Sequence, residues 1–156
     1  ILSFSFRSYK RSMDWKNELT LFTSALAVCP LNAKVHYNIG KTIANQSLAI
    51  EHYMEAIRLH PEYDQAMNNL ANILKEKGNY EEAESFLRNA IRLRPDFSAA
   101  WMNLGIVLSH INNFKEAEIC YGNALKFRKH YPDCYYNLGN LYLSQKMYRE
   151  ATEAWT

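Results

Sequence analysis

The sequence lacks every short motif by which a catalytic centre is usually identified. Its 156 residues include only five glycines and three cysteines, and they contain no glycine-rich phosphate loop, no HExxH pair and no nucleophile elbow. The cysteines, Cys29, Cys120 and Cys134, show no CxxC or Cys/His spacing, so the sequence indicates neither a zinc site nor a disulfide framework. We therefore expect no catalytic residue, no metal and no cofactor in this chain.

The histidines also show no pattern, because they are scattered along the sequence without a convergent Ser, Cys or acid. We interpret each of them as a helix-surface or partly buried residue rather than as a ligand or a general base. They are His36, His52, His60, His110 and His130.

An excess of charge and a long hydrophobic run are missing too. With 18 basic and 16 acidic residues the net charge is +2, and the basic residues are spread out, so we expect no nucleic-acid partner. The apolar residues 1–6 are too few to span a bilayer. Because Arg7, Lys10 and Arg11 follow them, residues 1–12 suit either the last turns of a membrane helix, with a linker, or the exposed remnant of a first helix.

What the sequence does contain is an internal repeat. Residues 101–105 read WMNLG, and residues 135–139, which lie 34 positions later, read YYNLG. The same offset places MNNLA at 67–71, and HYNIG at 36–40 lies 31 positions further upstream. The second half of the repeat has a pattern of its own, with Ala, a large residue and another Ala at fixed spacing, for example Ala117, Tyr121 and Ala124. A fixed period of this length indicates an array of helix pairs.

Turn residues and prolines predict where these helices end. Pro30, Pro61 and Pro95 are expected to end second helices, whereas Pro132 suits a first helical turn. Gly78-Asn79 and Asn112-Asn113 are expected to form the turns within pairs. The unit at 33–63 is three residues shorter than its neighbours, so we expect its turn around Asn45-Gln46-Ser47 to be shortened, at the expense of the last turn of its first helix. Glycines on first helices let the paired helices approach closely, and large aromatic side chains fill the space around them.

This pattern resembles the tetratricopeptide repeat. The resemblance implies an all-α fold, a right-handed superhelical solenoid of antiparallel helix pairs that binds polypeptide. It predicts a repeat domain at 13–156, with a partial repeat up to 32, full repeats at 33–63, 64–97 and 98–131, and a partial repeat at 132–156. The recurring aromatic residues, among them Trp101, Tyr121, Tyr135 and Trp155, are expected to belong to the core.

One polar residue recurs in every complete first helix, directly before the Leu-Gly pair. Asparagine is a poor helix former, so its recurrence needs a reason. Either the amides bond within or between repeats, or they line the concave face and bind an extended peptide backbone. The second reading is similar to the asparagine ladder of the nucleocytoplasmic O-GlcNAc transferase. The predicted peptide-binding residues are Asn38, Asn69, Asn103 and Asn137, with Tyr37, Met102 and Tyr136 beside them.

Three stretches lie outside the general repeat consensus, at 14–22, 32–41 and 131–139. Together they resemble the transmembrane and tetratricopeptide-repeat-containing (TMTC) protein O-mannosyltransferases. The resemblance implies that the chain is a fragment of an endoplasmic-reticulum membrane enzyme, which uses dolichyl phosphate mannose to mannosylate Ser or Thr of proteins such as cadherins. Its catalytic acid lies in a missing N-terminal membrane half. The present part is then the non-catalytic lumenal domain that binds the acceptor polypeptide, such as a cadherin domain.

Two features of the sequence favour different compartments. Asn45-Gln46-Ser47 is an N-glycosylation sequon, so Asn45 is a glycosylation candidate, which is compatible with the lumen. Basic residues beside the apolar start favour the cytoplasm instead. We follow the family and expect the endoplasmic-reticulum membrane, with the repeats in the lumen.

Two other classes of function stay open. One is a co-chaperone or assembly scaffold without an enzymatic role. A repeat that grips an acidic C-terminal tail needs Lys or Arg at matching places on successive first helices, whereas this chain has Lys41, Asn72, Ile106 and Asn140 there. The other is a self-contained enzyme, which would require a convergent acid, base or metal cluster.

Overall fold

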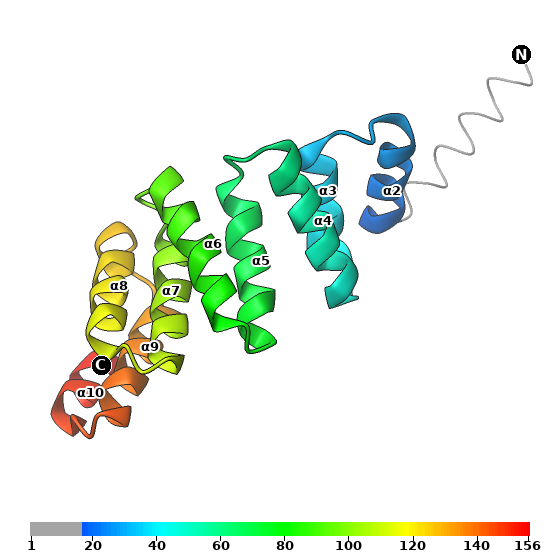
Figure 1. Ribbon diagram of the computed structural model, residues 1–156. Coiled ribbons are helices and arrows are strands. Elements are labelled where there is room, and N and C mark those ends of the chain that lie inside the picture. Colours follow the sequence, from blue (N-terminus) through cyan, green and yellow to red (C-terminus); the bar gives the residue numbers. More distant parts are fainter. Residues whose placement is uncertain (1–16) are drawn as a thin grey trace, which may run out of the picture. The chain divides into compact units, whose positions relative to one another are not determined.

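The computed structural model describes residues 17–156, and every regular element in that range is an α-helix (Figure 1). The predicted membrane-helix end or linker at 1–12 lies outside the described residues. The helices are α2 (Glu18–Val28), α3 (Ala33–Thr42), α4 (Gln46–Leu59), α5 (Asp64–Glu76), α6 (Tyr80–Leu93), α7 (Ser98–His110), α8 (Phe114–Phe127), α9 (Pro132–Ser144) and α10 (Tyr148–Trp155).

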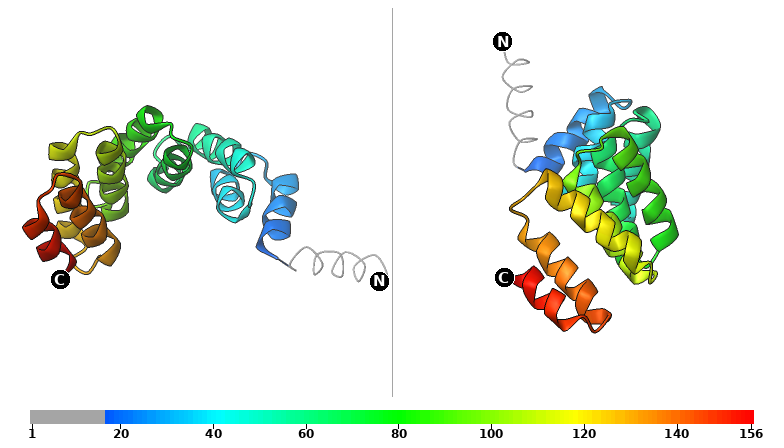
Figure 2. Two further views of the ribbon diagram at one scale, coloured as in Figure 1. Left: turned by 90° about the horizontal axis from the view of Figure 1, so that it is seen from below. Right: turned by 90° about the vertical axis from the view of Figure 1, so that its left-hand side faces the viewer.

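The chain forms two compact units, Ile1–Ala66 and Met67–Thr156. In the first unit α2 packs on α3 and α3 packs on α4. In the second unit α7 packs on α8 and α9 packs on α10, and the two helices of each of these pairs lie side by side (Figure 2). The all-helical array of helix pairs predicted from the repeat is therefore confirmed.

The helix ends lie where the sequence places them. Helices α2, α4 and α6 end at Val28, Leu59 and Leu93, each two residues before a proline. Pro132 is the first residue of α9, where its missing amide hydrogen leaves no intrahelical bond unmade. These prolines therefore separate successive helix pairs of the array.

The turn inside a pair uses one residue with positive φ. Gly78 has φ of 80° and Asn112 has φ of 62°, and both lie in the turns predicted from the sequence. The equivalent residue between α9 and α10 is Lys146, with φ of 61°. Lysine adopts this left-handed conformation at a cost that glycine does not have, and only the 34-residue period, which aligns Lys146 with Gly78 and Asn112, marks the position in the sequence.

Helix α3 is shorter than its counterparts, as predicted. It has 10 residues, whereas α5, α7 and α9 each have 13. Three residues, 43–45, join α3 to α4, as many as lie in the turns 77–79 and 111–113, so the expectation of a shortened turn is wrong. The Asn45 side chain caps α4 by accepting hydrogen bonds from the amides of Ser47 and Leu48. The deletion thus removes the last turn of α3 and leaves α4 at full length.

Glycine and aromatic side chains complement each other across the pairs. A Cβ on Gly105 would lie 2.7 Å from the Tyr121 ring, and one on Gly40 would lie 2.9 Å from the Tyr53 ring. In α5 and α6 the equivalent residues are Ala71 and Leu87, which are fully buried. The first helix therefore carries glycine where its partner is aromatic, and alanine where its partner is leucine, which keeps the space between the helices filled.

Not every recurring aromatic residue is in the core. Tyr53 and Tyr121 are buried, but Tyr135 is 39% and Trp155 is 44% exposed, so the expectation that all of them are core residues is wrong for these two. Helix α9 packs on α8 and covers Tyr121, whose carbonyl oxygen lies 3.6 Å from Cys134 Sγ. No helix follows α10 within the described residues, so Trp155 lacks such a cover.

The loops between successive pairs share a stacked contact of basic and aromatic side chains. The guanidinium carbon of Arg94 lies 3.6 Å from the Phe97 ring centre, and that of Arg128 lies 4.2 Å from the Tyr131 ring centre. The attraction between the guanidinium and the ring holds the two side chains together and orders the loop. None of the described helices combines the length and apolar character needed to cross a membrane.

Candidate peptide-binding site

The four predicted asparagines occupy equivalent positions on α3, α5, α7 and α9, but their surroundings differ. Asn38, Asn69 and Asn137 are half-buried, whereas Asn103 is only 8% exposed. Burial of a polar amide is tolerated only when it is hydrogen-bonded. The role of each residue therefore depends on what its amide contacts.

In the second unit, Asn103 joins α7 to α5. Its Nδ2 donates to Asn68 Oδ1 at 3.0 Å, and Asn68 Nδ2 donates to Asn69 Oδ1 at 3.3 Å. Asn68, which is also 8% exposed, was not among the predicted residues. Its counterparts in the other repeats are Tyr37, Met102 and Tyr136, so the repeat pattern alone does not mark it. The Asn103 nitrogen thus bonds between repeats, as the first of the two alternatives predicts.

Asn137 bonds within its own helix instead. Its Nδ2 donates to the Asp133 carbonyl at 2.7 Å, and its Oδ1 accepts no hydrogen bond from the described residues. Asn137 lines an open hollow of about 370 Å³ between α7 and α9, which we call the α7–α9 hollow. Ile106, Ser109 and Asn140 also line it. This hollow offers amide groups beside apolar surface.

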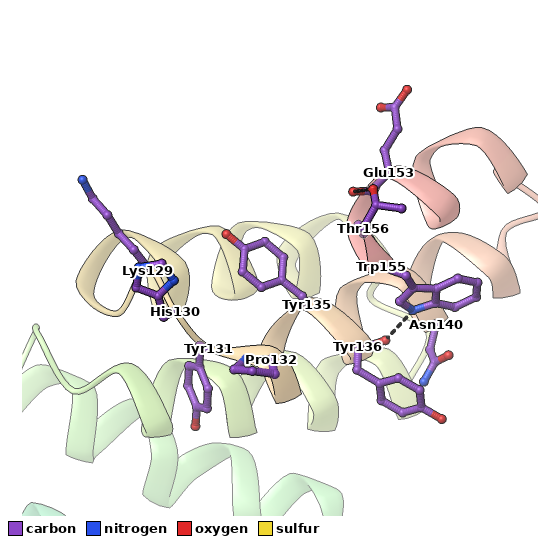
Figure 3. Close-up of a pocket in the computed structure, with 11 residues that line it drawn as sticks. Lys129, His130, Tyr131, Pro132, Tyr135, Tyr136, Asn140, Glu153, Trp155 and Thr156 are labelled. Atoms are coloured by element: carbon purple, nitrogen blue, oxygen red, sulfur yellow. Dashed lines mark hydrogen bonds between the residues drawn. The ribbon is translucent and has the colours of Figure 1, made fainter.

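A second hollow, of about 1000 Å³, lies between α9, α10 and the loop before α9; we call it the α9–α10 hollow (Figure 3). Tyr135, Tyr136, Asn140 and Trp155 line it. Trp155 Nε1 donates to the Tyr136 carbonyl at 3.3 Å, which fixes the indole beside the tyrosine. Asn140 lines both hollows, so the outer face of α9 borders two concave surfaces.

The three apolar candidates, Tyr37, Met102 and Tyr136, differ in how far their side chains are exposed to solvent. Tyr136 is 62% exposed, while Met102 and Tyr37 are half-buried. In the first unit Tyr37 stacks on Tyr63 with ring centres 4.9 Å apart. Burial, together with Tyr37 and Asp64, raises the pKa of Tyr63. Tyr136 is therefore the candidate whose ring is most open to a ligand.

The glycosylation candidate Asn45 is exposed at the start of α4. Its Oδ1 accepts the two backbone amides that begin the helix. N-glycosylation modifies the amide nitrogen, which leaves that oxygen in place.

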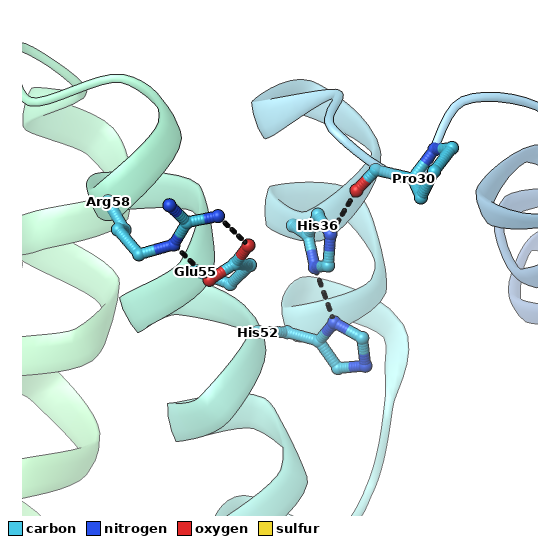
Figure 4. Close-up of polar contacts among 5 residues, drawn as sticks. All are labelled: Pro30, His36, His52, Glu55 and Arg58. Carbon is cyan, nitrogen blue, oxygen red and sulfur yellow. Dashed lines mark hydrogen bonds and ion pairs between the residues drawn. The ribbon is translucent and has the colours of Figure 1, made fainter.

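The structure brings together two histidines that show no pattern in the sequence, His36 and His52. His36 Nδ1 lies 3.0 Å from His52 Nδ1, and His36 Nε2 lies 3.1 Å from the Pro30 carbonyl oxygen (Figure 4). Burial and the neighbouring His36 lower the pKa of His52, and Glu51 opposes that shift. In the repeat alignment His36 is equivalent to Trp101 and His52 to Cys120. These positions lie on the two helices of one pair, so the alignment was the sequence signal that could have indicated the contact between the histidines.

The buried thiols are not nucleophiles. Burial raises the pKa of Cys120 to about 12 and that of Cys134 to about 11. A thiol attacks as its thiolate, so both side chains act as small apolar residues at neutral pH. Within the described part of the chain, no three His, Cys, Asp or Glu side chains gather as a metal site would require.

Models of the tetratricopeptide repeat match the chain at residues 65–97, 98–131 and 132–154. Among curated proteins, a protein O-mannosyl-transferase of Caenorhabditis elegans is 48% identical over 62 residues, which cover 38% of this chain and 9% of that protein. The protein O-mannosyl-transferase TMTC4 of Homo sapiens is 60% identical over 50 residues, covering 30% and 7%. From the three family-like stretches we expected the strongest resemblance to the fourth vertebrate member, and the match to TMTC4 has the higher identity of these two. The matched parts thus span less than a tenth of these relatives.

Solved structures share the fold. MamA from Desulfovibrio magneticus aligns with a TM-score of 0.78 and 16% identity, covering 97% of this chain and 87% of that one. PilF of Pseudomonas aeruginosa aligns with a TM-score of 0.78 and 22% identity, covering 97% and 70%. At these identities the likeness concerns the fold alone.

Proposed function

We propose, since the chain belongs to the tetratricopeptide repeat family, that it binds acceptor polypeptide for a protein O-mannosyltransferase. Its repeats are homologous to those of the TMTC protein O-mannosyl-transferases. Repeat arrays of this kind present extended surfaces to other proteins. The proposed role is to hold a polypeptide while mannose transfer takes place on another part of the enzyme.

The observation that carries the proposal is the face of α9. Tyr136 and Asn137 lie next to each other in the chain, and they border the α9–α10 hollow and the α7–α9 hollow respectively. Asn140, one turn further along, lines both. An amide provides a donor and an acceptor, which can pair with both groups of a peptide unit, and an exposed tyrosine ring adds apolar contact at low entropic cost.

The other predicted residues are proposed to contact polypeptide within each unit by itself. In the second unit these are Asn69, Met102 and the side-chain oxygen of Asn103. In the first unit they are Asn38 and Tyr37. Asn103 Nδ2 donates one hydrogen to Asn68, and Asn137 Nδ2 donates one to the Asp133 carbonyl, so each of these amides uses one of its two donor hydrogens within the fold.

The chemistry is proposed to reside outside this chain. The family resemblance implies a membrane half that holds the catalytic acid and uses dolichyl phosphate mannose as the donor. It further implies the endoplasmic-reticulum membrane, lumenal repeats and acceptors such as cadherin domains. Glycosylation of Asn45 is proposed to go with that compartment, and the exposed sequon is accessible for the modification.

The test compares binding of an unstructured Ser/Thr-rich peptide and of a folded cadherin domain to wild-type protein and to the double variant Tyr136→Ala/Asn137→Ala. The loss of a ring contact and an amide contact should weaken binding by about tenfold or more. Tyr148→Ala is the matched control, because Tyr148 on α10 is 63% exposed and lines neither hollow. Equal binding by wild type and the double variant, at unchanged helicity, would overturn the proposal.

A further inference from the structure

The α9–α10 hollow contains hydrogen-bond donors that the fold leaves unused. The hydroxyls of Tyr135 and Tyr136 and the side-chain amide of Asn140 form no hydrogen bond with the described residues. Both tyrosines are exposed, and Asn140 is half-buried. The indole N–H of Trp155 is used, because it donates to the Tyr136 carbonyl. A ligand in the hollow therefore meets three side chains with hydrogens to donate, set among aromatic rings.

The pair α7–α8 shows what stands at these places when a helix covers them. One repeat earlier, the equivalent residues of α7 are Trp101, Met102 and Ile106, and α9 packs on α7. Met102 and Ile106 have no side-chain donor, and the Trp101 indole already donates to the Pro95 carbonyl at 2.8 Å. Because a helix pairs its own backbone groups, it covers residues of this kind without leaving a donor unpaired.

In α5 the equivalent positions are polar, but neighbouring side chains bind them. Asn68 Oδ1 accepts from Asn103 Nδ2 at 3.0 Å, and Asn72 Oδ1 accepts from Lys75 Nζ at 2.6 Å. A helix packed into the α9–α10 hollow would instead bury the two tyrosine hydroxyls and the Asn140 amide beside a backbone with no free acceptor, which weakens binding. The hollow therefore suits a ligand whose backbone carbonyls are unpaired.

A proline-rich peptide has this property. Proline carries no N–H group, and in the polyproline II conformation the carbonyls form no hydrogen bond within the peptide. Such peptides dock in grooves lined by aromatic side chains, and their preformed conformation reduces the entropy lost on binding. Carbonyl acceptors and apolar proline rings thus match the donors and the aromatic rings of the hollow.

We propose that the α9–α10 hollow binds a proline-rich segment of the acceptor polypeptide in the polyproline II conformation, an inference that rests on the proposed function and names the class of segment held there. Tyr135, Tyr136 and Trp155 supply the aromatic walls, and Asn140 donates to a peptide carbonyl. Figure 3 shows the Tyr136 ring and the Asn140 side chain pointing to one side, below the Trp155 indole in this view. A volume of about 1000 Å³ lies at the upper end of the range for ligand pockets, so several peptide residues fit.

The charges at the two ends of the hollow favour an acidic residue beside the prolines. Lys129 is exposed in the loop before α9 and forms no ion pair with the described residues. Glu153 lies on the α10 side, where Arg149 Nε is 3.4 Å from its carboxylate (Figure 3). The unpaired charge is therefore the ammonium of Lys129, which attracts an Asp or Glu of the peptide.

The test measures binding of two peptides of equal length and charge to the whole chain by titration calorimetry. Both carry Asp at each end and contain Ser and Thr; one has repeated prolines, and the other has alanines in their place. We expect the proline peptide to bind at least about tenfold more tightly, because its rings pack on the aromatic walls in a preformed conformation. Lys in place of Asp should weaken its binding, and added salt should reduce that difference.

Helix α7 supplies variants whose side chains the repeat accommodates. Tyr136→Met and Asn140→Ile install the counterparts from α7, and Tyr135→Phe removes a hydroxyl alone. Each should weaken binding of the proline peptide by about threefold to tenfold, because a hydrogen bond is lost. Tyr148→Phe is the matched control: Tyr148 is 63% exposed and lines neither hollow, so this variant should bind like wild type.

The indole N–H signals in an NMR spectrum of the wild type give a readout that needs no variant. The signal of Trp155 should shift when the proline peptide is added, whereas that of Trp101, which is bonded to Pro95, should not. Equal affinity for the alanine peptide overturns the inference, as do unchanged affinities of Tyr136→Met and Asn140→Ile. So does an amphipathic helical peptide that binds more tightly than the proline peptide and shifts the Trp155 signal.

The alanine peptide separates this inference from the proposed function. If it binds as tightly as the proline peptide and loses affinity in Tyr136→Ala/Asn137→Ala, the face of α9 holds polypeptide without a preference for proline, and only this inference fails. If neither peptide binds, both fail.

Discussion

The pair α3–α4 of the first unit and the pair α7–α8 of the second are built on one repeat, yet they differ at two places. Helix α3 has lost three residues from its end, and α7 has not. His36 and His52 stand where α7 and α8 carry Trp101 and Cys120. Both pairs keep a glycine against a tyrosine, at Gly40 and at Gly105. These two pairs thus share the packing contact between a glycine and a tyrosine, while the end of the first helix and the residues at the two histidine positions differ.

The largest expected contrast between the units concerns their thiols. Cys29 of the first unit is exposed, whereas Cys120 and Cys134 of the second are buried. A thiol reagent at pH 8 should label Cys29 rapidly, and the other two slower by at least about a thousandfold, because they react only after unfolding. Counting labelled thiols over time, with and without denaturant, checks this. Rapid labelling of all three in the native protein would contradict the packing of α8 and α9.

Gly105→Ala should strongly destabilise the pair α7–α8. A Cβ there meets the Tyr121 ring at 2.7 Å, so the helices must part, and the free energy of unfolding should fall by about 2–3 kcal/mol. Urea unfolding followed by circular dichroism measures it. Gly122→Ala in α8 is the control: nothing lies within 4 Å of the added Cβ, so it should stabilise the protein by up to about 1 kcal/mol.

A double variant tests whether the residues at positions 105 and 121 depend on each other. Gly105→Ala/Tyr121→Leu recreates the Ala71 and Leu87 combination of the preceding pair. If the two positions are complementary, the double variant should be more stable than the sum of the single effects predicts, by about 1 kcal/mol or more. Additive effects would show that Gly105 and Tyr121 are selected independently.

Asn103→Ala tests the polar link between α5 and α7. It removes the 3.0 Å bond to Asn68 and leaves a buried amide oxygen unpaired, so it should cost about 1–2 kcal/mol of stability. Asn137→Ala removes an amide that bonds only within its own helix, and its effect should be below about 0.5 kcal/mol. Equal costs in thermal or urea unfolding would mean that the two asparagines have the same structural role.

Lys146→Gly should give the smallest effect, and it should be stabilising. Lys146 has φ of 61°, a conformation that glycine adopts without strain, so the variant should gain about 0.5–1 kcal/mol. Gly78→Ala, at the equivalent turn with φ of 80°, should lose a similar amount. A loss of stability in Lys146→Gly would contradict the left-handed turn.

Much of the fold could be predicted from the sequence, because the repeat places the same side chains at the same structural positions. The pairing of glycine with an aromatic ring, the proline-ended helices and the shortened α3 all follow from a 34-residue period and one deletion. The partners of the amides could not be predicted. Whether Asn103 binds a ligand or Asn68 depends on the residue one position before Asn69, where the repeat has no consensus. The His36–His52 contact likewise joins two helices at positions that carry other residues elsewhere.

The most direct test of the central claim is site-specific photo-crosslinking of a Ser/Thr-rich acceptor peptide to α9. A photoreactive phenylalanine analogue replaces Tyr136, and in a second sample it replaces Tyr148, which is equally exposed but outside both hollows. The account predicts crosslinked peptide from position 136 and little from position 148, with competition by unlabelled peptide. Equal crosslinking at both positions, or none at position 136 while the peptide binds, would contradict the claim that the face of α9 holds the acceptor.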